Sequence, residues 1–509
     1  MRVFNTLGNS LQEFVPVNPP KVGMYVCGVT VYDTVHVGHA RCYVSFDLIR
    51  RYLEYRGYEV IHTQNFTDID DKIINRSRTE QRDWRELTAT YIREYFRYMD
   101  QLGVKRAHNY PKASETVDQM ITIIQGLLDK GHAYIATNGD VYFSVQTFPG
   151  YGALVSSARL EQETVSRVAE SDVKRSPNDF ALWKAAKPGE PFWPSPWGNG
   201  RPGWHIECSA MTLQQYKGTF DIHGGGLDLI FPHHTNEIAQ TECYTGHKTA
   251  NYWLHNGFIK VDNDKMSKSL GNFITLQDAI DRHGAAALRM FFVKTHYRSP
   301  LNFDLELIDD SKGSIDRLVD AIGDAEAVMA YLGERNEELN KSGRKLSNAL
   351  AELEQKFVAA MDDDFNSPAG LAVIFEFAQA LFAYVRSVAA PNAAGANTSL
   401  LAQSVSLLRK LLLVLGFKTE ERTYDADRLA NALIQAGFAV SPGVDPLEQA
   451  VELRNLLRRE KNYTSADRVR DIVSETTGLT VKDWPFGSVC SRLSLIVDTD
   501  PRAFTEAAG

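Results

Sequence analysis

The hydrophobic pattern near the N-terminus predicts a buried strand followed by a helix. Val22, Met24 and Val26 lie two positions apart, as the residues on one face of a strand do. Four apolar residues then follow at helical spacing: Cys42, Phe46, Ile49 and Leu53. Gly57 is typical of a helix end, and residues 58–66 form a second apolar strand pattern. A strand, a helix and a second strand of these lengths predict a βαβ unit, and hence a parallel sheet.

The predicted helix begins near two histidines, in the motif His36-Val-Gly-His39. Free N–H groups and the positive end of the helix dipole favour a phosphate at such a start, and imidazoles can donate further hydrogen bonds to it. Gly38 has no side chain, so a base or a ribose can lie against the backbone there. The motif is short, and two histidines at a helix start without a ligand explain it equally well. The functional hypothesis is a nucleotide-binding site at this helix start.

Two later stretches also fit a nucleotide. His223 follows a predicted strand and precedes three glycines, which let a ligand approach the backbone, and Asp228 can accept hydrogen bonds from a ribose. Further on, the motif Lys265-Met-Ser-Lys268-Ser lies in a polar stretch. Two lysines are compatible with a phosphate, but a solvated loop is the better explanation of this stretch taken alone.

A candidate metal site draws on four separate places in the chain. Pro232 at a predicted helix start puts His233 and Glu237 one turn apart on one face. A surface pair is the commoner meaning of that spacing, but two cysteines change the picture. Cys27 ends the first predicted strand and Cys208 ends a later element, and strand ends converge at the ligand crevice of a doubly wound sheet. The four side chains are therefore candidate ligands of one metal ion.

The remaining pattern predicts an α/β protein with several domains, since 509 residues exceed the size of a single core. The fold we expect is a Rossmann-like, doubly wound parallel sheet with an inserted domain, followed by a helical bundle and a small C-terminal domain. The predicted segments are residues 1–111 and 204–255 (the two halves of the sheet), 112–203 (the insertion), 256–310 (the lysine motif and a junction), 311–417 (the bundle) and 418–509.

Composition limits the class of protein. With 44% hydrophobic and 23% charged residues, no apolar run expected to reach spanning length and no signal-peptide core, we expect a cytoplasmic protein without a membrane span. Five scattered cysteines favour reduced thiols or metal ligands over a disulfide framework. A net charge of −9 argues against a non-specific nucleic-acid coat. Local basic faces remain compatible with RNA binding, and residues 454–470 are the candidate.

The histidine and lysine motifs occur together in class I aminoacyl-tRNA synthetases, and the surrounding sequence resembles the cysteinyl-tRNA synthetase family, closely over residues 1–420 and loosely beyond. The resemblance implies ATP-dependent formation of cysteinyl-adenylate from L-cysteine, then transfer to the 3′ end of tRNA-Cys. It implies catalytic roles for His36 and His39 at the α-phosphate and for Lys265 and Lys268 at the pyrophosphate, with Mg²⁺ accompanying ATP. The implied ATP contacts are Gly28, Thr30, Gly38, His39, His223, Gly224, Gly225, Gly226, Asp228 and Lys268.

The resemblance also implies one zinc ion per chain. Its implied ligands are Cys27, Cys208, His233 and Glu237. Zinc binds a thiolate readily and a serine hydroxyl poorly, so it can separate cysteine from serine without an editing site. Thr67 is the implied substrate contact. Trp204 is either an aromatic wall beside the metal or a core residue, and His234 is expected to be a neighbour of the metal and not a ligand.

Residues 112–203 correspond to the family's connective peptide, 311–417 to a bundle that contacts the tRNA stem, and 418–509 to an anticodon-binding domain, in a monomer. Leu227, Thr235 and Cys490 depart from the family pattern. Three alternatives remain: a cysteine ligase acting on an amino sugar, which would lack the last domain; a nucleotidyltransferase, which would lack the lysine motif; and a non-catalytic, synthetase-derived RNA-binding protein, in which the motifs would be eroded.

Overall fold

The structure is a computed structural model that describes residues 1–155, 173–261, 264–265, 275–390 and 392–500. These residues form two compact units. One comprises Met1–Leu307, Met361–Ser367 and Thr499–Gly509, and the other comprises Ile308–Ala360 and Pro368–Asp498. The finer division into six segments remains a prediction.

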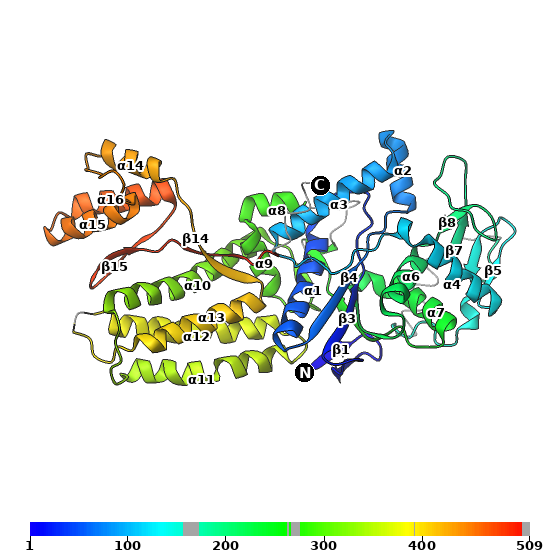
Figure 1. The fold of residues 1–509 in the computed structure, drawn as a ribbon, viewed down its shortest axis with the longest axis horizontal. Helices are drawn as coiled ribbons and strands as arrows, with labels where there is room; N and C mark the ends of the chain where they lie inside the picture. The colour runs from blue at the N-terminus through cyan, green and yellow to red at the C-terminus, as the bar shows by residue number, and fades with distance from the viewer. Residues whose placement is uncertain (156–172, 262–263, 266–274, 391, 501–509) are drawn as a thin grey trace. The chain divides into compact units, whose positions relative to one another are not determined.

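The first unit is built on a parallel sheet, as expected (Figure 1). Helix α1 (Val37–Tyr55) connects the first two strands along the chain and α7 (Thr235–Thr245) the last two, which confirms the predicted βαβ unit. Val22, Met24 and Val26 are fully buried. In spatial order the strands are β10 (Ala250–Asn256), β9 (Phe220–Gly226), β3 (Lys21–Val26) and β4 (Glu59–Gln64), and each neighbouring pair is parallel.

The strand order reverses between β3 and β9. From β3 the chain builds outward through α1 to β4, and from β9 it builds outward in the opposite direction through α7 to β10. In open α/β sheets, ligands bind beyond the carboxyl ends of the strands at such a reversal. The residues that follow β3 and β9 are therefore those to inspect for a site.

The N-terminal segment is a β-hairpin of β1 (Arg2–Asn5) and β2 (Ser10–Glu13). The buried side chain of Asn5 accepts a hydrogen bond from the N–H of Trp253 (2.9 Å) and donates to the carbonyl of Asn251 (2.8 Å). These bonds join the hairpin to β10. The alternation of only two inward residues was too short to show a strand in the sequence.

An antiparallel sheet interrupts the parallel one along the chain, where we expected an insertion. Its strands, in order, are β5 (Ala133–Ile135), β6 (Val141–Phe143), β7 (Phe180–Ala185) and β8 (Gly200–Pro202). The helices around it and before it are α2 (Asp71–Glu80), α3 (Trp84–Gln101), α4 (Val117–Asp129) and α6 (Trp204–Tyr216). Asp70 caps the start of α2 by accepting a hydrogen bond from the N–H of Lys72 (2.8 Å).

The segment around the lysine motif is held by a small sheet. Strand β11 (Ile259–Val261) pairs with β12 (Asp264–Lys265) and with β13 (Leu301–Asn302). Lys265 is the last residue of β12, and Lys268 lies outside the described residues. Helices α8 (Leu276–His283) and α9 (Ala285–Val293) follow.

The second unit begins with the predicted bundle, whose helices lie side by side in Figure 1. They are α10 (Leu305–Leu332), α11 (Lys341–Met361), α12 (Ser367–Val388) and α13 (Thr398–Val414). By length and composition α12 is apolar enough to cross a membrane, which corrects our expectation that no such run exists. Half of its most apolar window is buried inside the protein, as in the core helix of a bundle.

The chain ends in a small α+β domain. Its elements are β14 (Phe417–Glu421), α14 (Ala426–Gln435), α15 (Pro446–Arg459), α16 (Tyr463–Thr477), the hairpin β15 (Val481–Trp484) and β16 (Gly487–Cys490), and β17 (Leu493–Val497), which pairs with β14. Arg454, expected on a basic surface, is 1% exposed and forms ion pairs with Asp467 and Asp483. Its charge stabilises this domain and is not presented to a partner.

Candidate metal and nucleotide site

Two cysteines distant in sequence meet beyond the carboxyl end of β3. Cys27 directly follows β3, and Cys208 lies on α6. Both side chains are buried, and their Sγ atoms are 3.8 Å apart. Two thiolates on one tetrahedral zinc ion, with bonds of about 2.3 Å, would lie about 3.8 Å apart. The pair therefore has the separation of two sulfur ligands on a single metal ion.

A histidine and a glutamate complete the predicted constellation. His233 lies in the turn Ile230–His234, and Glu237 lies in the first turn of α7. The Nε2 atom of His233 is 3.1 Å from Oε1 of Glu237, and that oxygen is 3.8 Å from Sγ of Cys27. One ligand atom from each of Cys27, Cys208, His233 and Glu237 lies within 4.8 Å of the others, and all four residues are buried. Two sulfurs, one nitrogen and one oxygen fit a borderline-soft ion such as zinc.

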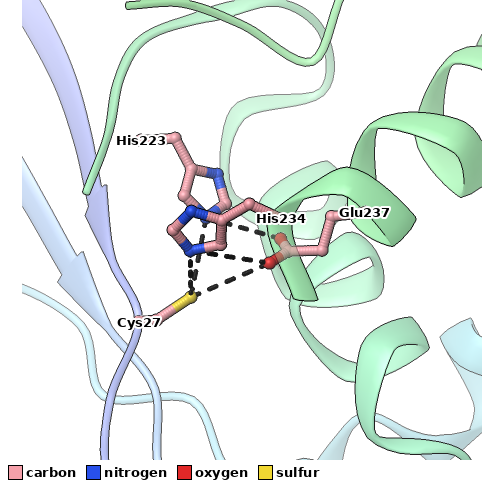
Figure 2. Close-up of side chains that lie close together, drawn as sticks. All are labelled: Cys27, His223, His234 and Glu237. Atoms are coloured by element: carbon pink, nitrogen blue, oxygen red, sulfur yellow. Dashed lines mark hydrogen bonds and ion pairs between the residues drawn. The ribbon is translucent and has the colours of Figure 1, made fainter. Parts of the chain in front are cut away.

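A second set of ligands overlaps the first (Figure 2). It replaces Cys208 and His233 with His223 and His234. The Sγ atom of Cys27 is 3.6 Å from Nε2 of His223 and 3.3 Å from Nε2 of His234. Since both sets share Cys27 and Glu237, they belong to one centre. The sequence correctly indicated His234 as a neighbour of the centre, but the structure places it at ligand distance.

His223 lies elsewhere than expected. Its ring is fully buried, stacks on Trp253 with centroids 4.3 Å apart, and lies 3.4 Å from Oε2 of Glu237. The ring therefore faces the metal candidates and not the helix start at which we expected ATP. The periodicity of β9 explains this, because successive strand side chains point to opposite faces of the sheet.

Further imidazoles orient the ligands. His205 and His233 face each other through their Nδ1 atoms (2.9 Å), which leaves Nε2 of His233 toward Glu237. His234 is held in the same way by Nε2 of His255 (2.8 Å), whose Nδ1 contacts the hydroxyl of Thr6 (2.7 Å). Such partners fix the tautomer and the ring orientation of metal ligands. Sequence analysis missed His205, His255 and Thr6, because no spacing relates them to the ligands.

Trp204 stands at the edge of this cluster. Its ring stacks on His233 with centroids 4.2 Å apart, and 38% of the residue is exposed. A core tryptophan would be covered on all sides. The geometry therefore favours the interpretation of Trp204 as an aromatic wall beside the metal candidates.

Burial sets the protonation of the cluster. It raises the pKa of Glu237 well above its usual value, with Cys208 adding to the effect, and it raises the pKa of the Cys27 thiol in the same direction. Burial lowers the pKa of His233 well below its usual value. A bound divalent cation would oppose the raised pKa values of Glu237 and Cys27, because it stabilises carboxylate and thiolate. Neutral imidazoles are already in the form that binds a metal ion.

A chain of hydrogen bonds links the two segments that carry the cysteines. The N–H of Gly28 donates to Oδ1 of Asn65 (2.8 Å), the amide of Asn65 donates to the hydroxyl of Thr67 (3.4 Å), and that hydroxyl donates to Oε2 of Glu207 (2.9 Å). A Cβ atom on Gly28 would lie 1.6 Å from the carbonyl oxygen of Asn65, so this approach requires glycine. Thr67 thus lies beside the cysteines, and Glu207 is a buried residue that sequence analysis missed.

The helix start differs from the prediction in one respect. His36 is the N-cap of α1, and its Nδ1 accepts hydrogen bonds from the N–H groups of Gly38 (3.0 Å) and His39 (3.4 Å). Those N–H groups are therefore not available to a phosphate. Burial lowers the pKa of His36 to about 4, against an opposing effect of Asp228, and it lowers the pKa of His39 well below its usual value. Both rings are neutral at pH 7.

The tautomers follow from these bonds. Nδ1 of His36 is an acceptor, and Nδ1 of His39 accepts from the N–H of His36 (3.3 Å). A neutral imidazole that accepts at Nδ1 carries its proton on Nε2. The two rings, stacked 3.7 Å apart, therefore each hold an N–H donor at Nε2. The arrangement provides two neutral donors at the helix start.

The three glycines after His223 lie in close contact with other protein atoms. A Cβ atom on Gly224 would lie 2.3 Å from the ring of Phe46, one on Gly225 would lie 2.8 Å from Leu229, and one on Gly226 would lie 2.4 Å from Oδ1 of Asp228. The sequence suggested close approach of a ligand, whereas the close approach that is present is to protein atoms. Their contacts to ATP remain a prediction, as does that of Thr30, which bridges Thr67.

Two family models match the chain. The model described as the class I (C) tRNA synthetase catalytic domain matches residues 13–313, and the DALR domain model matches residues 356–419. Among curated proteins, the cysteine–tRNA ligase of Thermodesulfovibrio yellowstonii is 44% identical over 488 residues, or 95% of this chain and 98% of that protein. The cysteine–tRNA ligase of Carboxydothermus hydrogenoformans is 43% identical over 487 residues, with 96% and 99% covered.

Solved structures share the fold at low identity. Methionyl-tRNA synthetase of Mycobacterium tuberculosis bound by methionyl-adenylate aligns with a TM-score of 0.60 and 13% identity, covering 78% of this chain and 90% of that one. The LeuRS–tRNA–LeuAMS complex of Agrobacterium radiobacter aligns with a TM-score of 0.57 and 12% identity, covering 79% and 84%. At such identities the likeness concerns the fold alone.

Proposed function

The chain belongs to the cysteinyl-tRNA synthetases, enzymes that use ATP to charge tRNA with cysteine, and we propose that its buried cluster holds one zinc ion that selects the substrate by its thiol. The proposed ligands are Cys27, Cys208, His233 and Glu237. The observation that carries the proposal is the meeting of these four side chains, from four separate places in the chain, within 4.8 Å. When bound, zinc supplies an electrophile that prefers a thiolate to a hydroxyl.

The protein's own residues complete the amino-acid pocket in this proposal. Trp204 forms a wall and closes one side of the cluster to water, since its ring covers His233. The hydroxyl of Thr67 donates to Glu207, so toward a substrate it can only accept, which suits an α-ammonium group. Cysteine is thereby held by both its side chain and its amino group.

Adenylate formation needs positioning and charge stabilisation more than covalent catalysis. We assign His36 and His39 to the α-phosphate, where their Nε2–H groups would donate to its oxygens. Neutral donors can act at this place, because their Nε2–H groups stabilise the developing charge and do not dissociate near pH 7. Lys265 and Lys268 are assigned to the pyrophosphate, and Mg²⁺ accompanies ATP. The main chain of Thr275, just after the lysine motif, forms a bridge with that of His36, which supports bringing the two motifs together.

The second unit is assigned to tRNA. The bundle would contact the stem of tRNA-Cys, and residues 418–509 its anticodon side. We propose a cytoplasmic monomer, as the family resemblance implies. Coverage of 98% of a cysteine–tRNA ligase, through the C-terminal domain, disfavours the amino-sugar ligase, whose chain would end earlier.

Cysteine-dependent ATP–pyrophosphate exchange, followed by charging of tRNA-Cys, tests the proposal. The purified protein should contain one zinc ion per chain by mass spectrometry and should activate cysteine in strong preference to serine. The Cys208→Ser variant should lose both the metal and this preference, whereas Cys243→Ser, which alters a partly buried thiol outside both ligand sets, should keep them. Equal activation of serine and cysteine by the wild-type protein would overturn the proposal.

A further inference from the structure

The turn Met361–Ser367 joins α11 to α12 but is part of the first compact unit, although both helices lie mostly in the second. It also lies beyond residues 13–313, which the catalytic-domain model matches. Asp364 and Phe365 adopt left-handed backbone conformations, with φ of 63° and 55°. Such angles cost free energy in residues other than glycine, and they persist where surrounding contacts impose them.

Contacts with α1 hold one side of the turn. The carboxylate of Asp362 accepts a hydrogen bond from the hydroxyl of Tyr52 (2.5 Å) and pairs with Arg56, and both residues belong to the C-terminal half of α1 or follow it directly. The ring of Phe365 meets that of Tyr52 edge-on, with centroids 6.2 Å apart. The turn is thus fixed to the helix that begins at the two histidines.

Asp364 holds the other side. Its buried carboxylate accepts hydrogen bonds from the N–H of Phe4 (2.8 Å), the hydroxyl of Tyr297 (2.9 Å) and Nε of Arg298 (2.6 Å). The ion pair with Arg298 and the bond from Tyr297 anchor two consecutive residues of the segment that precedes β13. A carboxylate with several good donors is strongly held, so this segment has a defined position.

A side chain of α1 also binds the main chain of this segment. Arg41 is fully buried, and its Nη2 donates to the carbonyl oxygens of His296 (3.1 Å) and Ser299 (2.8 Å). Arg41 lies two residues after His39. Within the described residues, its Nε and Nη1 atoms have no hydrogen-bond partner, so the side chain of Arg41 bonds to this segment through Nη2. Residues 296–299 are therefore held between α1 and the turn.

This clamped segment leads to the lysine motif through the small sheet. It continues into β13, β13 pairs with β11, and β11 pairs with β12, which ends at Lys265. The residues at this connection are closely packed. The N–H of Gly257, just before β11, donates to the carbonyl of Tyr297 (2.8 Å), and a Cβ atom on Gly257 would lie 2.3 Å from the carbonyl oxygen of Ser299. The position of residues 296–299 therefore sets the position of the hairpin that carries Lys265.

We propose that Asp364 is a positioning residue for adenylate formation. By holding residues 296–298 against Arg41, it fixes the spacing between the histidine motif at the start of α1 and the lysine motif, both of which must act on one ATP molecule. The proposal rests on the roles assigned to those motifs above. It gives a residue of the turn between two bundle helices, far in sequence from both motifs, an effect on the reaction of the first unit.

The test compares Asp364→Asn with Asp363→Asn in the full-length protein, using cysteine-dependent ATP–pyrophosphate exchange. Asp363 lies in the same turn, but its carboxylate is half exposed and pairs with the exposed Arg2. Asp364→Asn should lower kcat about tenfold to hundredfold, because small misplacements of reacting groups have effects of that size. The KM for cysteine and the metal content should stay within twofold of wild type, and Asp363→Asn should match wild type throughout. Tyr297→Phe removes one bond to the same carboxylate and should show a smaller effect in the same direction.

A double variant separates positioning from general damage. If Asp364 acts through the lysine motif, Asp364→Asn should change kcat by less than twofold in a Lys268→Ala background. Three results would overturn the proposal. They are a tenfold or larger further loss of kcat in the Lys268→Ala background, a loss of metal in Asp364→Asn or Tyr297→Phe, and a wild-type kcat in both of these variants. Absence of exchange in the wild-type protein would instead overturn the proposed function, so the two failures are distinguishable.

Discussion

His36 uses its two ring nitrogens for different purposes. Nδ1 accepts the hydrogen bonds of Gly38 and His39 and so caps α1, whereas the proton lies on Nε2, where we propose that it meets the α-phosphate. Sequence analysis offered a structural and a functional meaning for this histidine as alternatives. The geometry allows both in one residue, and substitution can separate them.

Substitution of His36 by asparagine and by alanine distinguishes the two purposes. Asparagine caps helices well, so His36→Asn should keep the stability of the wild type, while His36→Ala should lose about 1 kcal/mol of the free energy of unfolding. Both should lose about 10²-fold in the kcat of pyrophosphate exchange, because alanine has no donor and the amide of asparagine is too short to place one where Nε2 of His36 lies. Urea unfolding and exchange kinetics give the two quantities. Near-normal exchange by His36→Asn would mean that capping is the whole role of His36.

His205 is expected to act on the metal through His233. Their Nδ1 atoms are 2.9 Å apart, and partners of this kind change metal affinity about 10–100-fold when removed. His205→Ala should therefore weaken zinc binding by that factor, measured by competition with a chromophoric chelator. His247→Ala, at an exposed position, is the control and should bind zinc normally. Unchanged affinity in His205→Ala would show that the contact does not support the ligand.

At the scale of elements, the sequence allowed prediction where periodicity or capping acts locally. The β3–α1–β4 unit follows from apolar spacing, and α1 ends just before Gly57, the predicted helix end. Cys27, Cys208, His233 and Glu237 were predicted together because parallel strand ends converge and because of the family resemblance. The residues around these ligands could not be predicted, because His205 meets His233, His255 meets His234 and Glu207 meets Thr67 only through tertiary packing.

The three glycines after His223 show a different limit. A glycine in the sequence indicates a place where no side chain fits, but it does not indicate what comes close. At Gly224 the close neighbour is Phe46 of α1, on the buried face that the apolar spacing had already predicted. The sequence contained both residues, but their contact depends on how α1 lies against β9.

Gly224→Ala tests this assignment. The added methyl group would lie 2.3 Å from the ring of Phe46, and overpacking of this kind costs about 1–3 kcal/mol. Urea unfolding should show that loss, and the second substitution Phe46→Leu should recover part of it. Gly218→Ala is the matched control, since a Cβ atom there meets no atom within 4 Å. A Gly224→Ala protein of normal stability with a raised KM for ATP would instead assign the glycine to the nucleotide.

At the scale of the molecule, buried charges tie the elements of the first unit together. Burial alone would raise the pKa of Asp47 on α1, but Arg51 and Arg289 hold that pKa well below its usual value. Arg289 belongs to α9, and both arginines are buried. The ion pairs therefore join the helix of the histidine motif to a helix that follows the lysine motif.

Asp47→Asn should lower the free energy of unfolding by about 3–5 kcal/mol, because it removes the negative charge beside two buried guanidinium groups. Glu352→Gln, which removes an exposed ion pair with Lys356, should change it by about 0.5 kcal/mol or less. The folded pKa of Asp47 is depressed, so its contribution is complete above the unfolded value of about 3.9 and is lost as the pH falls below it. Urea unfolding should thus show a difference between wild type and Asp47→Asn that is constant from pH 7 to 5 and narrows below pH 4. A constant difference down to pH 3 would assign the effect to packing.

The second unit has its own internal attachment, between the bundle and the C-terminal domain. The ring of Phe486 stacks on Tyr331 of α10 with centroids 4.1 Å apart and an interplanar angle of 9°, and Trp484 extends the stack at 6.0 Å. Lys482 pairs with Asp320 (2.7 Å) and Asp324 (3.0 Å) of the same helix. The hairpin of β15 and β16 is thus fixed to α10.

Phe486→Ala tests whether this attachment serves tRNA. Without the stack, the C-terminal domain is held less firmly against α10. If residues 418–509 contact the anticodon side, this domain then loses more conformational entropy when it binds tRNA. Removal of an aromatic pair worth about 0.5–1.5 kcal/mol should lower kcat/KM for charging of tRNA-Cys about twofold to tenfold. Pyrophosphate exchange should be unchanged, because activation takes place in the other unit. Ile434→Ala, at an exposed position of α14, controls for loss of apolar surface. Normal charging of tRNA by Phe486→Ala would show that the stack stabilises the fold without contributing to tRNA binding. Impaired pyrophosphate exchange in this variant would show that the two half-reactions are not separated as proposed.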